Sequence, residues 1–449
     1  MKLKKKKFKN FLLSNNANFI SYAISKIHLT YFDNNKNENF NPILSLIKKF
    51  FYLFDNKNLY TKKQKHTDIL IISNLVSIKK KEEDIYFGNL NNLLKREKFN
   101  TLSVYRNLTS VRSKLLKNTK KNKILLSKRL SYFKEILIFY FFLKESFLLI
   151  FSTKYSLIRK HLNTMDLLSI IPNLRLNFQL EELLKFYKPK FVIFTYEGHA
   201  WERLLIYLCS KNEYKIKSIA YQFSAIKKSQ IGFFNELKKG YNPDYIASTG
   251  KISQKIIENK IKFSKIIKLG SPKYLKINRK YYKNVDVLVA LDTDKEDLFK
   301  VLNFCKDFAL KNSKYKIILR LHPIMSSNEK LITKIKKVIK NIPNIKLSNI
   351  SLMDDLKKAK YLLFTESTIC LTGLNYNVVP LFFNIKNTNN IFDRNFPKEN
   401  IIKNSSELKN LFEKKINKNL SHYFRNYRDN YFEKYDVASL KKIMKNNEK

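Results

Sequence analysis

Two short polar motifs in the last third of the chain carry side chains that can bind a phosphate. His322-Pro323 follows the apolar run Ile317–Leu321, and Thr365-Glu366-Ser367-Thr368 follows Tyr361–Phe364. Apolar runs of this length are typical of strands in an open parallel sheet, where ligands bind beyond the carboxyl ends of the strands. An imidazole and a group of hydroxyls that opens the next helix are suited to hold a phosphate. We therefore expect a shared phosphate site and a nucleotide-linked substrate.

A second polar segment follows another apolar run, Phe191–Phe194. It contains Glu197, Gly198 and His199, and the glycine permits a tight turn at the strand end. A carboxylate or an imidazole in this position can take a proton from a hydroxyl group that attacks a substrate. Glu197 is therefore the preferred candidate for a general base, and His199 is the alternative.

The C-terminal motifs also have a structural interpretation. His322 can be an incidental residue of a turn, and Ser367 and Thr368 can simply cap a helix. The functional interpretation is favoured because both motifs are expected at the ends of adjacent strands in one domain. Asp292-Thr293-Asp294 could hold a divalent metal, as Asp-x-Asp motifs do after a strand. The first turn of a helix explains Asp294 equally well, so we expect no metal site there.

The elements that must position these motifs form two series of short apolar runs that alternate with helical patterns. The first series has apolar runs at residues 68–72, 191–194, 218–221, 245–247 and 266–267. The second series has them at residues 286–291, 317–321, 345–347, 361–364 and 379–383. Short, fully apolar strands between helices are typical of buried parallel sheets. The predicted fold class is therefore α/β, with two Rossmann-like domains facing one cleft and a helical N-terminal extension.

The same pattern predicts the domain boundaries. Four segments are expected, namely a basic extension at residues 1–65, an N-terminal Rossmann-like acceptor domain with a helical insertion at 66–275, a C-terminal Rossmann-like nucleotide-sugar domain at 285–404, and C-terminal helices at 405–449. The helical insertion is expected within residues 110–165, and residues 273–284 are expected to link the domains. A chain of 449 residues exceeds what one hydrophobic core usually supports, which agrees with two domains.

The charge of the chain limits its partners. Its formal net charge is +51, from 88 Lys and Arg against 37 Asp and Glu, but only about a dozen of the basic residues are Arg. Because Arg is the residue that reads base edges and clamps phosphates bidentately, its scarcity argues against specific nucleic-acid recognition. The Lys-rich start, Lys2–Lys9, is better suited to hold the protein near anionic lipids.

The cysteines and the apolar segments indicate where the protein works. Cys209, Cys305 and Cys370 lie far apart, which predicts neither a disulfide framework nor a zinc site and fits a reducing cytosol. The apolar run Phe11–Leu13 is too short for a signal peptide. Residues 136–151 are shorter than the roughly 20 apolar residues of a spanning helix, so we expect a buried or membrane-facing helix there. The predicted location is cytoplasmic, with a peripheral position at the inner face of a membrane as an option.

The glycines exclude two classes of nucleotide-binding protein. The chain has only 7 glycines, and none forms a Gly-x-Gly-x-x-Gly or a Walker A arrangement. Dinucleotide oxidoreductases and P-loop NTPases are therefore not expected. A phosphate must instead be held by side chains and helix ends, as the motifs around His322 and Thr365 could do.

Three segments, Ile318–Pro323, Ser351–Leu356 and Phe364–Thr368, resemble the C-terminal half of GT-B glycosyltransferases for bacterial surface polysaccharides. The His-Pro and Ser/Thr pairing is especially similar to that of bacterial sialyltransferases and related Kdo transferases. The resemblance implies an inverting transfer of a sugar from a CMP-sugar, with a nonulosonate such as sialic acid or Kdo as the sugar. It implies a surface glycan acceptor, such as lipopolysaccharide or capsule, no required metal, and no cofactor beyond the nucleotide sugar as co-substrate.

The resemblance also implies roles for individual residues. His322 and Pro323 with Thr365, Ser367 and Thr368 would hold the donor phosphate, and His322 would stabilise its departure. Arg320 and Glu366 would be supporting or ribose contacts. Glu197 would be the base, because its place before a glycine is similar to that of the acidic residue in the sialyltransferases. Gly198, Trp201 and Gln222 would line the acceptor side or the cleft, although Phe223 stands where related proteins have His.

Other functions fit the same residues. CDP-glycerol glycerophosphotransferases carry a similar motif pair and would attack phosphorus rather than an anomeric carbon. A GT-B enzyme that uses a UDP-sugar or a dTDP-sugar is a further alternative. A basic peripheral membrane protein or polyanion-binding protein without catalysis is the non-enzymatic one. The expected partners are a nucleotide-sugar donor, a glycan or glycolipid acceptor and an anionic membrane surface, with no specific nucleic acid.

Overall fold

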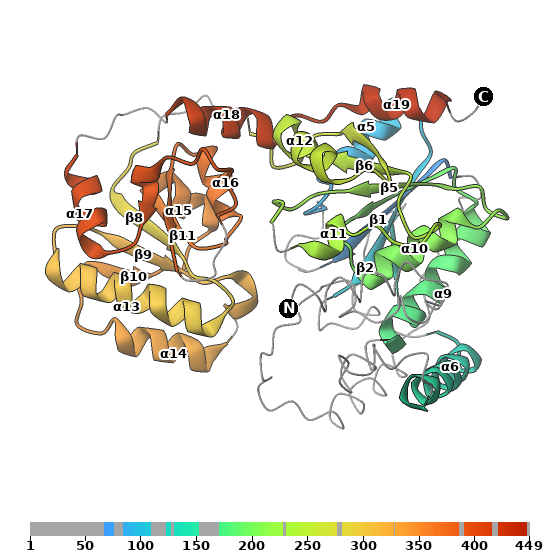
Figure 1. The fold of residues 1–449 in the computed structure, drawn as a ribbon, viewed down its shortest axis with the longest axis horizontal. Coiled ribbons are helices and arrows are strands. Elements are labelled where there is room, and N and C mark those ends of the chain that lie inside the picture. The colour runs from blue at the N-terminus through green and yellow to red at the C-terminus, as the bar shows by residue number, and fades with distance from the viewer. Residues whose placement is uncertain are drawn as a thin grey trace. The chain divides into compact units, whose positions relative to one another are not determined.

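The protein was analysed as a computed structural model, which forms two compact units. The structure describes residues 67–75, 84–108, 123–126, 130–151, 170–227, 230–275, 281–326, 328–385, 390–414 and 421–446. The first unit, termed the N-domain, runs to Phe223 and adds Gln230–Pro272 and the chain from Lys434 onward. The second unit, termed the C-domain, comprises Ser224–Ser229 and Lys273–Glu433. Each domain is built on one parallel sheet (Figure 1).

The sheet of the N-domain has the strand order β3-β2-β1-β4-β5-β6-β7. Its strands are β1 (Ile69–Leu75), β2 (Thr101–Asn107), β3 (Lys123–Leu126), β4 (Phe191–Thr195), β5 (Lys217–Tyr221), β6 (Tyr245–Ser248) and β7 (Lys265–Lys268). All neighbouring pairs are parallel. The chain winds outward from β1 to β3 and then continues from β4 on the other side. The topological switch point, where ligands bind in such sheets, therefore lies between β1 and β4.

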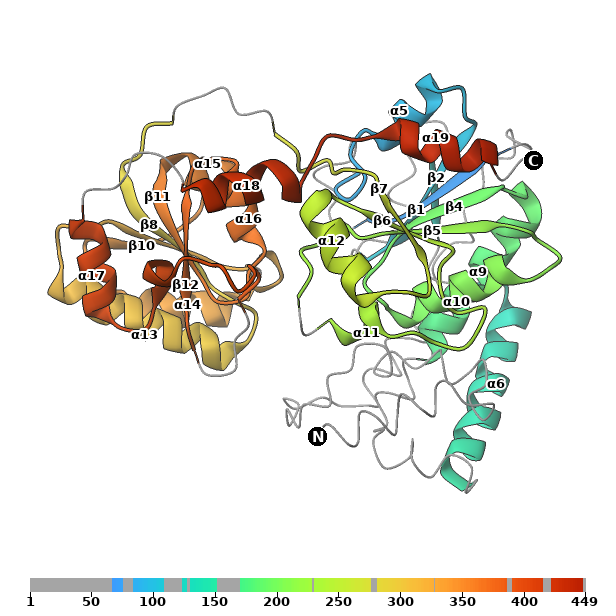
Figure 2. The same ribbon diagram turned by 45° about the horizontal axis from the view of Figure 1, so that its top comes forward.

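Helices connect these strands. They are α5 (Leu90–Arg96), α6 (Tyr132–Phe151), α9 (Ile170–Tyr187), α10 (Ala200–Ser210), α11 (Ile231–Phe234), α12 (Lys251–Lys260) and, at the end of the chain, α19 (Val437–Asn446). Leu440 and Met444 of α19 are buried in the core of the N-domain, and both views show α19 beside α5 (Figures 1 and 2). The hydroxyl of Tyr435 donates to the carbonyl of Phe87 at 2.9 Å. The last helix thus belongs to the first domain.

The sheet of the C-domain repeats this winding with the order β10-β9-β8-β11-β12-β13. Its strands are β8 (Val285–Ala290), β9 (Ile317–Arg320), β10 (Ile345–Leu347), β11 (Ala359–Phe364), β12 (Val379–Phe383) and β13 (Ile401–Ile402). All neighbouring pairs are again parallel. The switch point of this sheet lies between β8 and β11.

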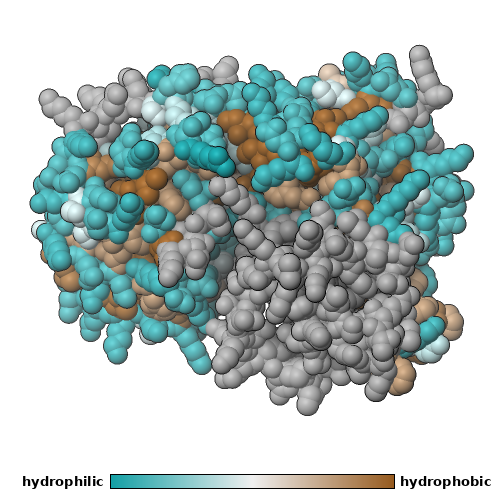
Figure 3. All heavy atoms as spheres, in the orientation of Figure 1, coloured by the Kyte–Doolittle hydropathy of each residue, from teal (hydrophilic) through white to brown (hydrophobic). Residues whose placement is uncertain are grey.

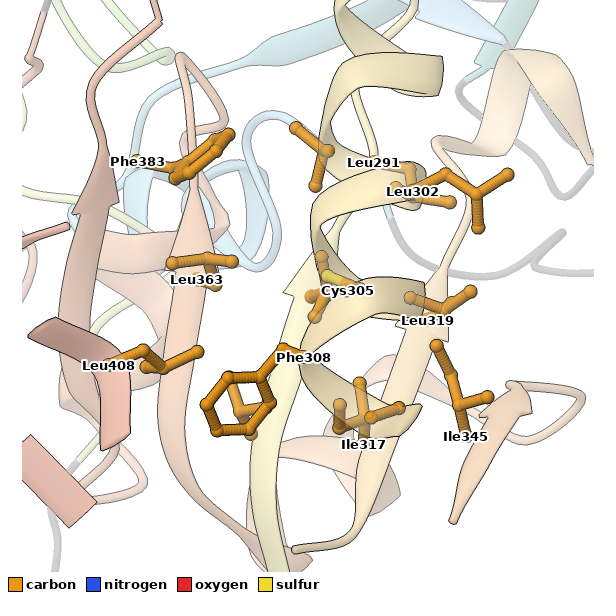
Figure 4. Close-up of a cluster of buried hydrophobic side chains, with 14 of the residues drawn as sticks. Leu291, Leu302, Cys305, Phe308, Ile317, Leu319, Ile345, Leu363, Phe383 and Leu408 are labelled. Atoms are coloured by element: carbon orange, nitrogen blue, oxygen red, sulfur yellow. The ribbon is translucent and has the colours of Figure 1, made fainter. Parts of the chain in front are cut away.

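Helices cover the sheet of the C-domain. They are α13 (Lys295–Lys311), η4 (Pro323–Met325), α14 (Glu329–Val338), α15 (Leu352–Lys358), α16 (Ile369–Leu374), η5 (Lys398–Asn400), α17 (Ser405–Glu413) and α18 (His422–Tyr431). Cys305 and Phe308 of α13 are buried against the sheet with Leu319 and Leu363 (Figure 4). The hydroxyl of Ser351 accepts a hydrogen bond from the amide of Asp354 at 3.2 Å, which caps the start of α15.

The predicted α/β class and the two parallel sheets are confirmed. Within residues 110–165, where helix was predicted, Tyr132–Phe151 forms α6, but Lys123–Leu126 is strand β3 and pairs with β2, so the prediction was wrong for that segment. The other residues of this range, apart from residues 130 and 131, lie outside the described residues. Residues 1–65, predicted as a helical extension, lie outside the described residues. In the part of the chain that is described, no helix is long and apolar enough to cross a membrane.

Candidate functional site

Polar side chains gather at the switch point of the N-domain. Asn74, the next-to-last residue of β1, is paired in register with Arg106 of β2, while Thr195 ends β4. The amide of Asn74 donates to the Thr195 hydroxyl at 3.5 Å across the switch point. These three residues line a cavity of about 320 Å³ together with Glu197 and His199. The structure therefore brings the predicted base and its alternative into one pocket at the expected edge of the sheet.

Glu197 and His199 form a hydrogen-bonded pair. His199 Nε2 lies 3.1 Å from Glu197 Oε2, and the two side chains are 35% and 28% exposed. Burial lowers the pKa of His199, but the hydrogen bond to Glu197 and the charges of Glu202 and Glu197 outweigh it, so that the pKa is raised. A carboxylate and an imidazole in contact, both reachable from a cavity, can accept and pass on a proton.

Glu202 fixes the turn that carries this pair. One of its carboxylate oxygens accepts hydrogen bonds from the amides of Glu197, Gly198 and His199 at 2.9, 2.7 and 2.8 Å. Burial raises the pKa of Glu202 to about 7, although the charge of His199 and these amide hydrogen bonds oppose the rise. Gly198 has a φ of +85°, and a Cβ there would lie 2.2 Å from the backbone of Gly232. The predicted need for glycine at this turn is thus a matter of both conformation and space.

Arg203 supports a neighbouring loop and does not pair with Glu202. Its guanidinium donates to the carbonyls of Tyr241, Gly232 and Asn235 at 3.0, 2.8 and 2.9 Å. Each of the two residues therefore has a separate role in holding backbone.

Trp201 lines the cavity, and its ring stacks against Arg106, a cavity residue that the sequence analysis did not predict. The guanidinium carbon of Arg106 lies 4.2 Å from the centre of the Trp201 ring. Trp201 is nearly buried and also contacts Phe194 edge to face, with 6.3 Å between the ring centres. A possible signal for Arg106 was its place near the end of an alternating strand, β2, but that strand was not predicted.

The sequence suggested that Gln222 lines the cleft, but Gln222 does not line this cavity. It is buried, and its side-chain oxygen accepts a hydrogen bond from the Thr249 hydroxyl at 3.4 Å. The next residue, Phe223, lines the cavity instead. An apolar ring therefore takes the position for which related proteins suggested a polar subsite.

In the C-domain, the two phosphate motifs meet around a third strand. They were predicted on adjacent strands, and this was wrong, because β8 lies between β9 and β11. Asp292 follows β8 and so stands between the motifs. Its Oδ2 accepts a hydrogen bond from the Thr365 hydroxyl at 3.2 Å, and its Oδ1 accepts one from the Thr293 amide at 2.6 Å.

His322 lies next to charged groups at this edge. Burial lowers its pKa, the charge of Lys227 adds to the fall, and the charge of Asp292 opposes it. The imidazole is therefore neutral at pH 7 and can donate one hydrogen bond and accept another. Lys227 is 4.0 Å from Glu366, the residue predicted as a ribose contact. Lys227 lies in a loop remote in sequence from both motifs, and nothing in the sequence pointed to it.

Of the three hydroxyls of the second motif, that of Thr365 is bonded to Asp292 and the other two are available. Ser367 and Thr368 are half-buried, and within the described ranges neither makes a hydrogen bond through its side chain. Thr368 holds the N-cap position of α16 without a side-chain capping bond. The capping interpretation of Thr368 is therefore not supported. Pro323, which begins η4, is exposed.

Arg320 is engaged within its own domain. Its guanidinium lies 2.6 Å from Oδ2 of buried Asp355 and 3.0 Å from the carbonyl of Ile350. The hydroxyl of Ser348 donates to the same carboxylate oxygen at 2.6 Å. Arg320 thus ties the end of β9 to β10 and α15. This geometry favours a supporting role over a direct contact with the nucleotide.

The acidic motif after β8 begins a helix. Asp294 is the N-cap of α13 and accepts a hydrogen bond from the amide of Asp297 at 2.9 Å. Among the described residues, no group of three or more His, Cys, Asp and Glu side chains could hold a metal ion. The structure therefore gives Asp294 the helix-capping role that was the alternative to metal binding.

Comparisons with known proteins bear on the fold. No protein-family model matches the chain, and no curated protein matches it in sequence. A protein from Listeria monocytogenes assigned as a UDP-N-acetylglucosamine 2-epimerase is similar in structure, with a TM-score of 0.51 and 10% identity over 84% of this chain and 95% of that one. MnaA from S. aureus bound to UDP has a TM-score of 0.49 at 12% identity, over 84% and 95% of the two chains. The α,α-trehalose-6-phosphate synthase of Burkholderia multivorans has 0.48 at 11%, over 85% and 98%.

At these identities the similarity shows the fold alone. The fold of the Listeria protein, at a TM-score of 0.51, agrees with the architecture of two parallel-sheet domains and with the predicted GT-B-like class. The chemistry must be argued from the side chains at the two switch points.

Proposed function

We propose that this chain is an inverting glycosyltransferase that takes its sugar from a nucleotide sugar. The observation that carries the proposal is the pair of switch points, which hold different and complementary side chains. The N-domain holds the hydrogen-bonded pair Glu197 and His199 beside a cavity. The C-domain holds neutral His322, two hydroxyls without hydrogen bonds among the described residues, and Lys227. One set is suited to remove a proton, and the other to bind a phosphate.

In the proposed reaction the N-domain activates the acceptor. Glu197 takes the proton of the attacking hydroxyl, and His199 holds the carboxylate in place through the 3.1 Å hydrogen bond. The raised pKa of His199 favours its protonated form, which strengthens this hydrogen bond. If His199 instead acts as the base, Glu197 becomes the orienting group.

The C-domain would stabilise the leaving group. The acceptor oxygen attacks the anomeric carbon, the bond from that carbon to the phosphate oxygen breaks, and the nucleotide leaves with the electron pair. His322, Ser367 and Thr368 would donate hydrogen bonds to the phosphate, and Lys227 would offset its charge. Glu366 would hold Lys227 or the ribose, while Arg320 supports β9 from behind.

Two observations bear on the identity of the donor, and they point to different nucleotides. The His-Pro and Ser/Thr motifs favour a CMP-linked nonulosonate, whereas the name of the Listeria protein concerns a UDP-sugar. We place the CMP-sugar first because the motif residues lie at the switch point itself. The acceptor would be a surface glycan or its lipid-linked precursor at the cytoplasmic face of the membrane. A UDP-sugar donor and CDP-glycerol remain the named alternatives.

Nucleotide binding tests the proposal. Thermal stability should be measured with CMP, CDP, UDP, GDP and dTDP, because a ligand at 100 times its dissociation constant adds about 2.7 kcal/mol. CMP should stabilise the protein, and His322→Ala should abolish the shift. His422→Ala, which removes an exposed histidine from α18, is the matched control.

The outcomes separate the alternatives. A preference for UDP or dTDP would change the donor and keep the reaction type. Binding of CDP-glycerol with transfer of glycerophosphate would change the reaction. If no nucleotide stabilises the protein and it binds polyanions with steep salt dependence, the enzyme proposal is wrong and the binding-protein alternative is favoured.

A further inference from the structure

One arginine side chain that lines the cavity of the N-domain, Arg106, makes no hydrogen bond or ion pair with its described neighbours. Arg106 stacks on Trp201, yet its guanidinium makes no hydrogen bond and no ion pair with the rest of the chain as described. A guanidinium has five N–H donors, and leaving them without acceptors in a partly buried place is costly. Stacking fixes the plane of the group and leaves its edge for a ligand.

The carboxylates around Arg106 are already engaged. Glu202 accepts the three amide hydrogen bonds of the turn, and Glu197 is bonded to His199. The charge of Glu202 opposes the effect of burial on Arg106, but no contact joins the two. The guanidinium is thus compensated at a distance and not paired.

An unused acceptor lies beside this unused donor. Asn74 is the register neighbour of Arg106 on β1, and its amide nitrogen donates to Thr195. Its buried side-chain oxygen has no hydrogen-bond partner. Both residues line the same cavity as Glu197. A ligand that fits must offer an anionic group to Arg106. Asn74 Oδ1 is buried, so a hydroxyl or N–H group of the ligand reaches it only when the Asn74 side chain rotates.

We propose that Arg106 and Asn74 form an acceptor subsite for an acidic sugar. The carboxylate or phosphate of the sugar binds the edge of the guanidinium bidentately, and one of its hydroxyls donates to Asn74 Oδ1. Another hydroxyl then lies toward Glu197, which removes its proton. The acceptor role rests on the proposed glycosyl transfer, whereas the binding of an acidic sugar does not.

Trp201 reports directly on this subsite. It is the only Trp among the 449 residues, so all tryptophan emission comes from the ring beneath Arg106. Glucuronate, glucose 6-phosphate and glucose should be titrated separately at fixed ionic strength while the emission is recorded. We expect a saturable change with one or both acidic sugars and none with glucose. The two acidic sugars show whether the subsite prefers a carboxylate or a phosphate.

Variants of Arg106 make the test specific. Arg106→Gln should weaken the response about tenfold or more, and Arg106→Lys, which keeps the charge but loses the fork, should weaken it less. Arg394→Gln, at an exposed arginine of the C-domain, is the control. An equal response to glucose, or an unchanged response in a folded Arg106→Gln, would overturn the subsite.

Nucleotide stabilisation of the same variants separates this proposal from the previous one. If Arg106→Gln loses the acidic-sugar response and keeps its nucleotide shift, both proposals hold. If the wild type responds to the acidic sugars and no nucleotide binds, the subsite stands and the donor assignment fails.

A second feature, the exposed side of α6, supports an independent inference. Seven large side chains of this helix are between 42% and 70% exposed, namely Tyr132, Phe133, Ile136, Phe139, Tyr140, Leu143 and Phe147. At 3.6 residues per turn they fall within an arc of about 120°, which we term the aromatic arc. Apolar side chains lie exposed in Figure 3 in the place that α6 has in Figure 1.

The opposite side of α6 is anchored to α9. Buried Glu135 forms two hydrogen bonds with Arg175, at 2.8 and 2.7 Å, and Lys134 pairs with Glu182. Ile138, on the same side, is 1% exposed. The helix therefore cannot rotate to bury the aromatic arc without breaking a buried ion pair.

We infer that the aromatic arc lies in the surface of an anionic membrane. Five of its seven side chains are aromatic, and tyrosines are suited to the boundary between head groups and acyl chains. Exposed Lys144 borders the arc, and the whole chain carries a net charge of +51, which complements anionic lipids. The helix would lie in the plane of the membrane and not cross it.

Sedimentation with lipid vesicles tests this inference. The full chain should bind vesicles of phosphatidylcholine with about one third phosphatidylglycerol more tightly than vesicles of phosphatidylcholine alone. The triple variant Phe133→Ser, Tyr140→Ser, Phe147→Ser should lose about tenfold or more in vesicle partitioning. Tyr282→Ser with Leu310→Ser, which removes exposed apolar residues elsewhere, is the control.

Two results would overturn it. Unchanged partitioning of the triple variant, with Trp201 emission showing an intact N-domain, would mean that the arc does not touch the membrane. A change from dimer to monomer in the triple variant, with vesicle binding unaffected, would assign the arc to a second copy of the chain.

Discussion

The N-domain and the C-domain wind their sheets in the same way and use the resulting edge differently. In the N-domain the chain runs outward from β1 to β3 before β4, and in the C-domain it runs outward from β8 to β10 before β11. The first edge holds a carboxylate bonded to an imidazole. The second holds a neutral imidazole, a lysine and hydroxyls. The winding supplies the place for a ligand, and the side chains decide which ligand and which chemistry.

The two histidines show this difference most clearly. His199 lies beside Glu197 and Glu202, and its pKa is raised. Burial lowers the pKa of His322, while the charge of Asp292 raises this pKa and the charge of Lys227 lowers it further. The same side chain thus tends to be charged at one edge and neutral at the other, which agrees with a proton-handling role in the first domain and a hydrogen-bonding role in the second.

Removal of the proposed base should have the largest effect. Glu197→Gln keeps the size of the side chain and removes the carboxylate, so kcat for sugar transfer should fall about 10²- to 10⁴-fold. Nucleotide binding should not change, because the proposed donor site lies in the C-domain. Rates should be compared with those of Glu258→Gln, which alters a glutamate in α12.

Two results would refine or reject this assignment. A small loss in Glu197→Gln with a large one in His199→Ala would make His199 the base. A loss of nucleotide binding in Glu197→Gln would contradict the division between the two edges.

Arg320 tests whether a residue of the C-domain edge is structural. Arg320→Ala leaves the buried carboxylate of Asp355 with Ser348 and without its cation, so the free energy of unfolding should fall by about 3 kcal/mol. Urea unfolding followed by circular dichroism measures this change. Lys357→Ala breaks an exposed ion pair with Asp354 and should leave the stability nearly unchanged. If Arg320→Ala has normal stability but binds nucleotide more weakly, Arg320 contacts the nucleotide directly, as the resemblance had implied.

The pH dependence of stability should have opposite signs in the two domains. In the N-domain, the pKa values of Glu202 and His199 are raised by folding, so the folded state holds more protons. Its stability should fall as the pH rises from about 4.5 through about 7, by about 3 kcal/mol for Glu202. In the C-domain, the lowered pKa of His322 means that the unfolded state holds more protons, so stability should rise with pH up to about 6.5.

Domain-specific probes measure these slopes. Trp201 reports unfolding of the N-domain, and hydrogen exchange in β8 and β11 reports the C-domain. Glu202→Gln should flatten the first slope and leave the second. Slopes of the same sign in both domains would show that the contrast between the two edges is wrong.

Short, fully apolar strands were predictable from the sequence. Runs such as Phe191–Phe194 and Tyr361–Phe364 are buried and appear as β4 and β11. Strand β2 was not, because it contains Ser, Tyr and Arg. The missed strand β2 is also the one that carries Arg106. A failure to predict a strand thus became a failure to predict a site residue.

Residues at the candidate site were predictable when they follow a strand directly. Glu197, His199 and His322 were found in this way, and the structure places them at the expected edges. Lys227 was not, because its position depends on a loop segment that belongs to the C-domain although it lies between two stretches of the N-domain. The order of the strands in the sheet could not be predicted from the sequence either, so the position of Asp292 between the two motifs was not predicted.

Hydrogen exchange with bound nucleotide tests the central claim most directly. The exchange of wild-type protein should be compared with and without the nucleotide that stabilises it most. We predict that protection increases in segments 320–326 and 364–369 at the C-domain switch point and does not change in segment 195–203 of the N-domain. Protection of segment 195–203 with unchanged exchange in the other two segments would contradict the assignment of the donor to the C-domain.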